Sequence, residues 1–526
     1  MIGVIADEAD HDVVREFFEL FKTPWEYWRP GQLYNVVLCA AEAGLDETPA
    51  QLVVVYASAR SRSGVSAAAR VACELSWQGS RFPIYQGCTT FGEMESRLLV
   101  EADSGRSALQ IKTRGQGRVV SIGYDLFAEV RTLLTSGQPA VHAGTPTLEL
   151  HIALLRDIIA GSGLALTEIP PVPTGYRFIA CLTHDVDHPL IRNHGFDHTT
   201  LGFLYRATAG SVRGMLRGRR RARDVWRNVA AAARLPLVHV GLAGDFWSQF
   251  DRYAALEKGA RSSFFVIPFR DRPGRRGSGQ APSRRAARYG AAEIARQIRR
   301  LGAAGCEIGT HGIDAWTDSS AGRTELEEIR RIAGVEKMGI RMHWLYFNER
   351  SPEVLEAAGA DYDSTVGYNE TVGYRAGTTQ VYQPLGCRRL LELPLHIMDT
   401  AMFYPNHLDL SPQDARIRAG AILDDAVRFG GCVTVNWHDR SIAPERCWGD
   451  FYVELIDEMR KRGAWFGTAG EVVAWFRQRR AARFEGPGTS TESIQVQTPE
   501  ATDVELPGLD LRTVYGNQQP AMACRD

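Results

Sequence analysis

Residues 177–188 read RFIACLTHDVDH, an apolar run followed by two aspartates and two histidines. The apolar run has the length and composition of a buried strand, so the ionisable residues are expected near its carboxyl end. Residues two apart in an extended segment point to the same side, and the carboxylates of Asp185 and Asp187 can therefore face one pocket. Two close carboxylates repel each other unless a cation lies beside them, so this spacing favours a divalent metal.

The alternation of apolar runs and amphipathic helices continues from residue 176 to residue 477. Strands are expected at 177–182, 262–269, 306–311, 339–347, 360–366, 390–398, 432–438 and 464–469, and helices at 291–305, 324–334, 351–359, 412–431 and 453–463. Strands and helices that alternate over this length favour an α/β fold with a parallel sheet, open or closed into a barrel.

Ionisable residues fall late in most of these strands. They are Asp185, Asp187, His311, His343, Asp363, Glu392 and His438. The carboxyl ends of parallel strands form one face of the sheet, so we expect these side chains to converge on one mouth. Each residue alone has a structural interpretation, as a helix cap or a hydrogen-bonded core residue, and the hypothesis of a site depends on their recurrence. A metal held by carboxylate and imidazole, with positions open to water, is typical of hydrolysis.

The order of these motifs resembles a known family. THDVDH, EIGTHG, IRMHWLYF, DYDST, LELP and VNWHD follow one another as in the polysaccharide deacetylases, carbohydrate esterase family 4 in the broad sense. The resemblance covers about residues 176–477 and implies a distorted (β/α) barrel, placed here at 176–480. It also implies a metal-dependent hydrolase that removes an N-acetyl group from an amino sugar, with zinc as the expected divalent metal.

The resemblance assigns a role to five residues. Asp185 matches the catalytic base and Asp187 the metal-binding carboxylate of the opening motif. His311 matches the first histidine of the family's metal-binding His-[ST]-x-x-His motif. Arg341 resembles the arginine that orients the base, and His438 resembles the general acid that protonates the departing amine.

One position departs from the family's pattern. The second metal histidine should stand four residues after His311, where this sequence has Ala315. His343 is the candidate replacement because it also lies near a strand end, so the expected metal ligands are Asp187, His311 and His343. Weaker candidates that could support the ligands are His184, His188 and Asp314. A barrel without metal or activity, which binds glycan or anionic lipid, is an alternative, as is a hydrolase of another non-peptide C–N bond such as a cyclic amide.

The rest of the chain divides at the Pro-rich segment 167–177. Residues 1–170 have strand-like runs and helical periodicity, which predict an N-terminal α/β accessory domain without an assigned role. Residues 484–526 are polar, rich in Pro and Gly and without periodicity, which predicts a disordered tail.

The composition leads us to expect a cytoplasmic protein. The 526 residues have a net charge of −1 and are 44% hydrophobic, which excludes a disordered or fibrous chain and does not indicate nucleic acid as a partner. Nine dispersed cysteines without a C-x-x-C spacing favour a reducing compartment. No basic leader followed by an apolar segment and no uncharged membrane span is recognised. We therefore expect a carbohydrate partner that is an intracellular precursor, either lipid-linked or nucleotide-linked.

Two further groups of residues could contact such a substrate. The arginine-rich segments 211–227 and 269–290 are expected to leave from the active face and could recognise phosphate or an anionic headgroup, whereas a solvated surface is the more common explanation of such a charge run. Tryptophans beside the motifs could form a stacking wall for a sugar ring or could belong to the core: Trp316, Trp344, Trp437 and Trp448.

Overall fold

The computed structural model describes residues 1–40, 50–57, 73–91, 98–216, 220–277, 279–485, 495–497 and 505–515. The chain forms two compact units, and each is described by itself. Unit 1 comprises Met1–Gly175, Tyr374–Gly386 and Trp475–Asp526, and unit 2 comprises Tyr176–Gly373 and Cys387–Ala474. The boundary at Gly175 lies beside the Pro-rich segment, whereas the return of 374–386 to unit 1 was not expected from the sequence.

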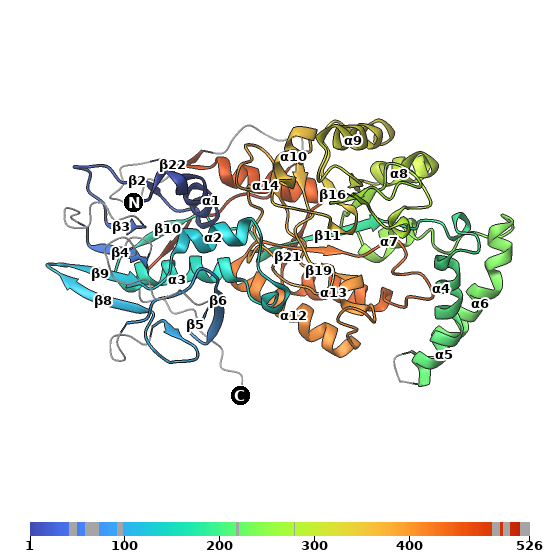
Figure 1. Cartoon of the computed structure of the whole chain (residues 1–526), viewed down its shortest axis with the longest axis horizontal. Helices are drawn as coiled ribbons and strands as arrows, with labels where there is room; N and C mark the ends of the chain where they lie inside the picture. Colours follow the sequence, from blue (N-terminus) through green and yellow to red (C-terminus); the bar gives the residue numbers. More distant parts are fainter. Residues whose placement is uncertain are drawn as a thin grey trace. The chain divides into compact units, whose positions relative to one another are not determined.

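Unit 2 is built on a nine-stranded parallel sheet (Figure 1). Its strands are β11 (Phe178–Val186), β12 (Ser263–Val266), β15 (Glu307–Gly312), β16 (Ile340–Met342), β17 (Tyr362–Asp363), β18 (Leu391–Glu392), β19 (Ile397–Met398), β20 (Cys432–Asn436) and β21 (Ala464–Phe466). They lie in the order β18-β17-β16-β15-β12-β11-β20-β19, and β21 pairs with the first residues of β11. The parallel α/β architecture expected from the sequence is confirmed.

The sheet is curled but open. Among the described residues of unit 2, no pairing joins β18 to β19, so the barrel expected from the sequence is a half-barrel here. The expected strand 390–398 is two short strands, because Pro394 between them has no N–H to give to a sheet. The expected strand 339–347 ends at Met342, since Trp344 and Leu345 adopt left-handed backbone conformations in a short turn at His343–Leu345.

Helices cover the sheet as the amphipathic patterns predict. They include α7 (Phe250–Glu257), α8 (Ala295–Ala303), α9 (Ser319–Ala333), α10 (Ser351–Ala358), α12 (Pro412–Phe429) and α13 (Gly449–Lys461), beside the short α11 (Asp399–Phe403). All nine residues of β11 are buried, which explains its almost continuous apolar sequence. Asp185 at its carboxyl end lies opposite Phe265 of β12, and His311 of β15 lies opposite Arg341 of β16. These registers bring the polar strand ends to one edge.

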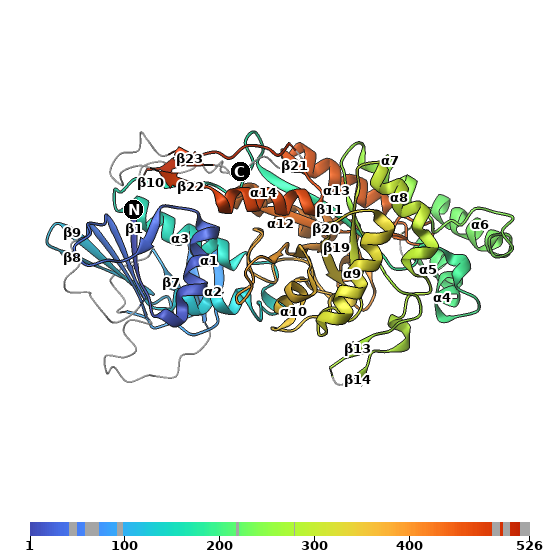
Figure 2. The ribbon, with the colours of Figure 1, turned by 90° about the horizontal axis from the view of Figure 1, so that it is seen from above.

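Between β11 and β12, three helices precede α7: α4 (His198–Ala207), α5 (Ala209–Leu216) and α6 (Ala222–His239). They lie together beside the sheet of unit 2 in both views (Figures 1 and 2). The carboxylate of Asp197 accepts hydrogen bonds from the N–H groups of Thr199 and Thr200, so it caps the amino end of α4. The inner faces of α4 and α6 pack in one apolar cluster with Trp247.

Unit 1 contains a six-stranded sheet with the order β2-β1-β3-β4-β9-β8. Its strands are β1 (Ile2–Ile5), β2 (Trp25–Tyr27), β3 (Val36–Cys39), β4 (Leu52–Tyr56), β8 (Leu109–Arg114) and β9 (Gly117–Ile122), of which only β8 is antiparallel to its neighbour. The unit also holds the helices α1 (His11–Phe21), α2 (Leu126–Leu134) and α3 (Thr147–Gly161), and a small sheet of β5 (Cys73–Trp77), β6 (Ser80–Ile84) and β7 (Val100–Glu101).

Part of the segment expected to be a disordered tail forms strands. β22 (Arg483–Glu485) pairs with β23 (Gln495–Gln497), and β24 (Arg512–Val514) pairs with β10 (Leu166–Glu168) of unit 1. Nε of Arg512 donates to the Glu168 carboxylate at 2.8 Å, which adds an ion pair to the backbone pairing. The remainder of 486–526 lies outside the described residues, apart from 505–511 and Tyr515. None of the helices that the structure describes is long and apolar enough to cross a bilayer.

Candidate metal centre and active site

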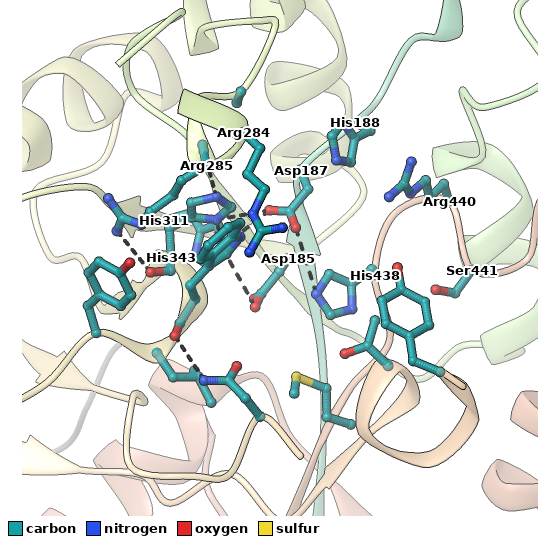
Figure 3. A pocket seen from close by; sticks show the side chains of 18 of the residues that line it. Asp185, Asp187, His188, Arg284, Arg285, His311, His343, His438, Arg440 and Ser441 are labelled. Carbon is teal, nitrogen blue, oxygen red and sulfur yellow. Dashed lines mark hydrogen bonds and ion pairs between the residues drawn. The ribbon is translucent and has the colours of Figure 1, made fainter. Parts of the chain in front are cut away.

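A cavity of about 580 Å³ opens at the carboxyl ends of the unit 2 strands. Five of the six site residues expected from the sequence line it: Asp185, Asp187, His311, His343 and His438. The sixth, Arg341, is fully buried behind Asp185. Figure 3 shows the five cavity-lining side chains turned toward one another; Asp185 and Asp187 come from the end of β11, and the three histidines come from other segments of the sheet. The structure therefore brings together five of the seven residues that the strand-end pattern singled out.

Three potential metal ligands converge at one side of the cavity. The Nδ1 atom of His343 lies 3.3 Å from Oδ1 of Asp187, and the Nε2 atom of His311 lies 3.4 Å from the same oxygen. The two ring nitrogens are 3.0 Å apart. These residues form the metal-ligand group found among the described residues, and each offers one ligand atom to it.

Hydrogen bonds to backbone carbonyls orient both rings. Nδ1 of His311 lies 2.9 Å from the carbonyl oxygen of Arg341, and Nε2 of His343 lies 3.0 Å from that of Arg285. A carbonyl oxygen only accepts hydrogen bonds, so each outer nitrogen holds the ring proton. The inner nitrogen of a neutral ring then presents a lone pair, and burial lowers the pKa of His343, which favours its neutral form. Two lone pairs and a carboxylate oxygen thus face one another.

The arrangement fits a divalent metal ion. Oδ1 of Asp187 is buried and has no hydrogen-bond partner. Metal–ligand distances of about 2.1 Å in a tetrahedral site place neighbouring ligand atoms about 3.4 Å apart, close to the observed separations. A set of two imidazoles and one carboxylate is a ligand set that zinc prefers.

Asp185 is held as an ionised carboxylate beside these ligands. Its Oδ1 accepts a hydrogen bond of 3.0 Å from Arg341, and its Oδ2 accepts one of 2.7 Å from Nδ2 of Asn436. Burial raises the pKa of Asp185, but its charged neighbours, Arg341 and His438 among them, outweigh burial and lower it. Arg341 is itself fixed by bonds to Thr183 and to the backbone of Ser364. The carboxylate is therefore both charged and fixed in orientation.

His438 lies beside the ligand group, next to Asp187. Its Nδ1 lies 2.6 Å from Oδ1 of Asp399, and its Nε2 faces Asp187 at 3.8 Å. Burial lowers the pKa of His438, but Asp399, followed by Asp187 and Asp185, outweighs burial and raises this pKa to about 10. His438 is therefore an imidazolium at neutral pH, with one N–H directed into the cavity.

Sequence reasoning missed three residues of this arrangement. Asp399 follows β19, and the strand-end pattern that found Asp187 would also have found Asp399 if 390–398 had been divided at Pro394. Asn436 lies two residues before His438, on the strand that the pattern had already identified. The carbonyl of Arg285 left no signal in the sequence, because a backbone contact depends on the path of the loop.

Ala315, which stands where the family's pattern has the second metal histidine, is packed against a helix. Ala315 is fully buried, and its Cβ lies 3.0 Å from the position that a Cβ on Gly322 of α9 would occupy. This close approach of the helix leaves no room for an imidazole. His343 enters the same cavity from the end of β16 instead.

Several expected residues lie elsewhere. Asp363 and Glu392 do not line the cavity, contrary to the strand-end expectation; they lie opposite each other in the fully buried pairing of β17 and β18. Burial raises the pKa of Asp363 to about 6 and that of Glu392 further above its usual range.

The three weaker candidates for supporting the metal ligands have other partners. The ring of His184 bonds to Glu257 and to the carbonyl of Trp437, away from the cavity. The carboxylate of Asp314 accepts a hydrogen bond from the N–H of Arg275. His188 lines the cavity and bonds to His194.

The four tryptophans divide between core and cavity. Trp437 is fully buried and stacks on Phe451 and Tyr452, so it belongs to the core. Trp316 is buried against Tyr346, and Trp448 packs on Phe403. Trp344 alone of the four lines the cavity.

Arginines surround the remainder of the cavity. Arg276, Arg284 and Arg285 come from the second arginine-rich segment, and Arg440 and Arg446 follow His438. One terminal nitrogen of Arg440 and Nε of Arg446 are buried without a hydrogen-bond partner, as is Nε of the nearby Arg206. Burial, and then repulsion from Arg446 and Arg440, lowers the pKa of Arg206 to about 9. This side of the cavity therefore gathers several arginines, some of whose buried nitrogens have no hydrogen-bond partner.

Comparisons with known proteins were made for sequence and for structure. No family model and no curated protein matches the sequence. Several solved structures match the fold. A protein of Mycobacterium smegmatis assigned as a polysaccharide deacetylase shares 18% identity at a TM-score of 0.35, over 64% of this chain and 100% of its own.

A PuuE allantoinase shares 12% identity at a TM-score of 0.35, over 58% of this chain and 92% of its own. A family 4 acetyl xylan esterase from Clostridium thermocellum, solved with a cobalt ion, shares 14% identity at a TM-score of 0.24, over 56% of this chain and 91% of its own. The solved structures that match this chain thus include polysaccharide deacetylases and members of carbohydrate esterase family 4, the family whose motifs residues 176–477 resemble.

Proposed function

We propose that the protein is a metal-dependent hydrolase that removes an N-acetyl group from an amino sugar in a glycan or in a lipid-linked or nucleotide-linked precursor. The observation that carries the proposal is the inward direction of the His311 and His343 lone pairs beside Asp187. This ligand group lies between an ionised carboxylate, Asp185, and a protonated imidazole, His438. Base, ligands and acid therefore share one cavity.

Asp187, His311 and His343 would hold the metal, with zinc as the expected ion. Such an ion polarises a carbonyl group and lowers the pKa of a bound water toward neutrality. Asp187 contributes its unpartnered Oδ1, while the carbonyls of Arg341 and Arg285 keep both rings in the tautomer that a metal requires.

The remaining chemistry belongs to the protein's own side chains. Asp185, oriented by Arg341 and Asn436, accepts a proton from the water that attacks the acetyl carbonyl carbon. The C–N bond then breaks, and His438 gives the proton on its Nε2 to the departing amine. Asp399 keeps His438 protonated until that step. The products are acetate and a free amino sugar.

The cavity supports a carbohydrate substrate with an anionic group. Its volume of about 580 Å³ is in the range for a small-molecule site, and Trp344 offers an aromatic face to a sugar ring. Arg440 and Arg446 present unpartnered donors at the other end, where the forked geometry of arginine suits phosphate. We infer a phosphate-bearing sugar precursor.

We also interpret unit 2 as a distorted (β/α) barrel of the deacetylase type, to which unit 1 is an accessory domain. We also propose the cytoplasm as the location, because the nine cysteines of the sequence are dispersed without a C-x-x-C spacing.

Metal content and acetate release test the proposal together. Elemental mass spectrometry of the purified protein should find close to one metal ion per chain, and Asp187→Ala, His311→Ala and His343→Ala should each lose it. The metal-loaded protein should release acetate from N-acetylated sugar phosphates, and Asp185→Asn should keep the metal but lose this activity. Absence of metal after reconstitution with zinc would contradict the hydrolase and leave a binding protein, whereas metal with activity only on cyclic amides would change the substrate.

A further inference from the structure

Exposed apolar side chains gather on the three helices α4, α5 and α6. More than half of the large hydrophobic residues that are exposed in the described chain lie between 196 and 242: Phe196, Leu201, Tyr205, Val212, Met215, Leu216, Trp226, Val229, Leu237, Val240 and Leu242. Phe196 is 96% exposed and Trp226 is 74% exposed. Monomeric proteins rarely expose contiguous apolar surface on this scale without a partner.

Helix α6 has two apolar stripes. One stripe contains Ala231, Leu235 and Val238, which are buried in the cluster around Trp247. The other contains Trp226, Val229, Leu237 and Val240, which are exposed. With about 100° per residue, the exposed stripe spans an arc of about 80° on the side of the helix opposite the buried stripe. Packing within unit 2 therefore accounts for only one of the two stripes.

The two preceding helices also carry exposed apolar side chains. Leu201 and Tyr205 are one turn apart on α4, and Val212 and Met215 are one turn apart on α5, which begins two residues after α4 ends. Phe196 lies just before α4, and Leu242 lies just after α6. The three helices lie together in both views of the fold (Figures 1 and 2). We call this set of exposed residues on α4–α6 the helical patch.

The segment that carries the helical patch is strongly basic compared with the whole chain. Residues 196–242 include nine arginines, no lysine or glutamate and two aspartates, while the chain as a whole has a net charge of −1. Arg223, Arg227 and Arg234 are exposed on α6, in the arc between its two stripes. A row of cationic side chains thus borders the exposed apolar stripe.

We propose that the helical patch binds the surface of an anionic phospholipid bilayer. A helix that lies in the interface inserts one apolar stripe and places flanking basic residues at the lipid phosphates, which is the pattern of α6. Arginine and tryptophan are suited to this boundary, because each combines an apolar part with a polar end. The proposal goes beyond the hydrolase and does not depend on it.

Co-sedimentation with vesicles tests the proposal on the full chain. The protein should bind vesicles of phosphatidylglycerol and phosphatidylcholine, and binding should fall as salt is raised and in pure phosphatidylcholine. Leu237→Ser should lower the partition coefficient about tenfold or more, since Leu237 belongs to the inserted stripe. Ile417→Ser on α12 is the matched control, because Ile417 is also exposed on a helix of unit 2 and should have no effect.

A second pair of variants tests the charge. Arg227→Glu combined with Arg234→Glu should lower binding to the anionic vesicles about tenfold or more. The matched control is Arg296→Glu combined with Arg299→Glu, because both arginines are exposed on α8. This control should lower binding to the anionic vesicles much less. Circular dichroism should show that every variant keeps its helical content.

Three results would overturn the proposal. They are absence of wild-type binding to anionic vesicles, equal effects of Leu237→Ser and Ile417→Ser, and a wild-type dimer that Leu237→Ser converts to a monomer. The last would assign the helical patch to a second copy of the chain. None of these results depends on metal or acetate release, so the hydrolase and the membrane surface can fail separately.

Discussion

Asp399 holds Nδ1 of His438 at 2.6 Å, and the same carboxylate accepts the backbone N–H of His438 at 2.7 Å. The two residues follow the neighbouring strands β19 and β20, whose parallel register sets Met398 opposite Asn436. Imidazole and carboxylate are thus joined by side chain and by backbone, which favours the protonated ring in this cavity.

Replacement of Asp399 should therefore move the pH profile of the enzyme. The acid must be protonated to act, so kcat/KM is expected to fall as pH rises through the pKa of His438. Asp399→Asn removes the charge that raises this pKa, and the alkaline limb should move about 1–3 pH units lower. The profile of acetate release against pH measures the change. Asp424→Asn, on the outer helix α12, should leave the limb in place, and an unshifted limb in Asp399→Asn would remove His438 from the role of acid.

A histidine at position 315 should not be able to replace His343 as a metal ligand. His343→Ala should lower the metal affinity by at least about tenfold, since it leaves two ligands in place of three. The double variant with Ala315→His should not regain the metal, because Ala315 packs against α9 at Gly322. It should also be less stable than the single variant by about 1–3 kcal/mol, as expected for overpacking. Metal titration and thermal unfolding measure both effects, and recovery of metal by the double variant would show that the loop can repack.

Arg341 should matter for turnover and not for the metal. Its guanidinium orients Asp185, so Arg341→Met is expected to reduce kcat about 100-fold or more while the metal content stays close to one per chain. KM should change much less than kcat. Loss of metal in a folded Arg341→Met protein would contradict this separation.

Arg446 should contribute to the binding of phosphate. It is 7% exposed, and its Nε has no hydrogen-bond partner. Arg446→Met keeps much of the length of the side chain but removes its charge, so inorganic phosphate should bind about tenfold more weakly in calorimetry. Arg416→Met, at an arginine paired with Glu454 on the surface, is the control and should bind phosphate as the wild type does.

A buried glutamate should make stability depend on pH. Burial raises the pKa of Glu325 from 4.5 to about 7, although its carboxylate accepts the N–H groups of Ile313 and Asp314. The folded state thus binds this proton more tightly than the unfolded state. Its contribution to stability is present below pH 4.5 and is lost as pH rises through 7.

Glu325→Gln removes this proton exchange. Relative to the variant, the free energy of unfolding of the wild type should fall by about 3 kcal/mol between pH 4 and pH 8. Urea unfolding in the presence of a chelator measures the difference. A constant difference across this range would show that Glu325 titrates normally.

The sequence predicted the sheet and most of the site because both follow from local pattern. An apolar strand followed by polar residues is sufficient to place Asp185, Asp187 and His311 at one edge. The same rule misplaced Asp363 and Glu392, because their strands have only two residues each and their side chains face each other inside the sheet. The two carbonyls that orient the ligand histidines could not be predicted, since they depend on strand register and on the path of a loop.

For the helices that follow β11, the sequence was not sufficient to predict the surface they form. No helix was expected from the sequence at 222–239, where residues 222–227 were interpreted only as part of an arginine-rich segment. A sequence also cannot tell which apolar stripe of such a helix packs on the protein. The exposure of Trp226 and Leu237 and the burial of Leu235 resolve this only in three dimensions.

Arg341 contacts two site residues through two separate groups, its backbone carbonyl and its guanidinium. Its peptide carbonyl fixes the ring of His311, and its guanidinium fixes Asp185. A codon change at this position alters only the second, since every amino acid provides the same carbonyl. Natural substitutions at position 341 could therefore abolish turnover and still preserve metal binding. Metal binding and turnover must be measured separately in any variant of β16.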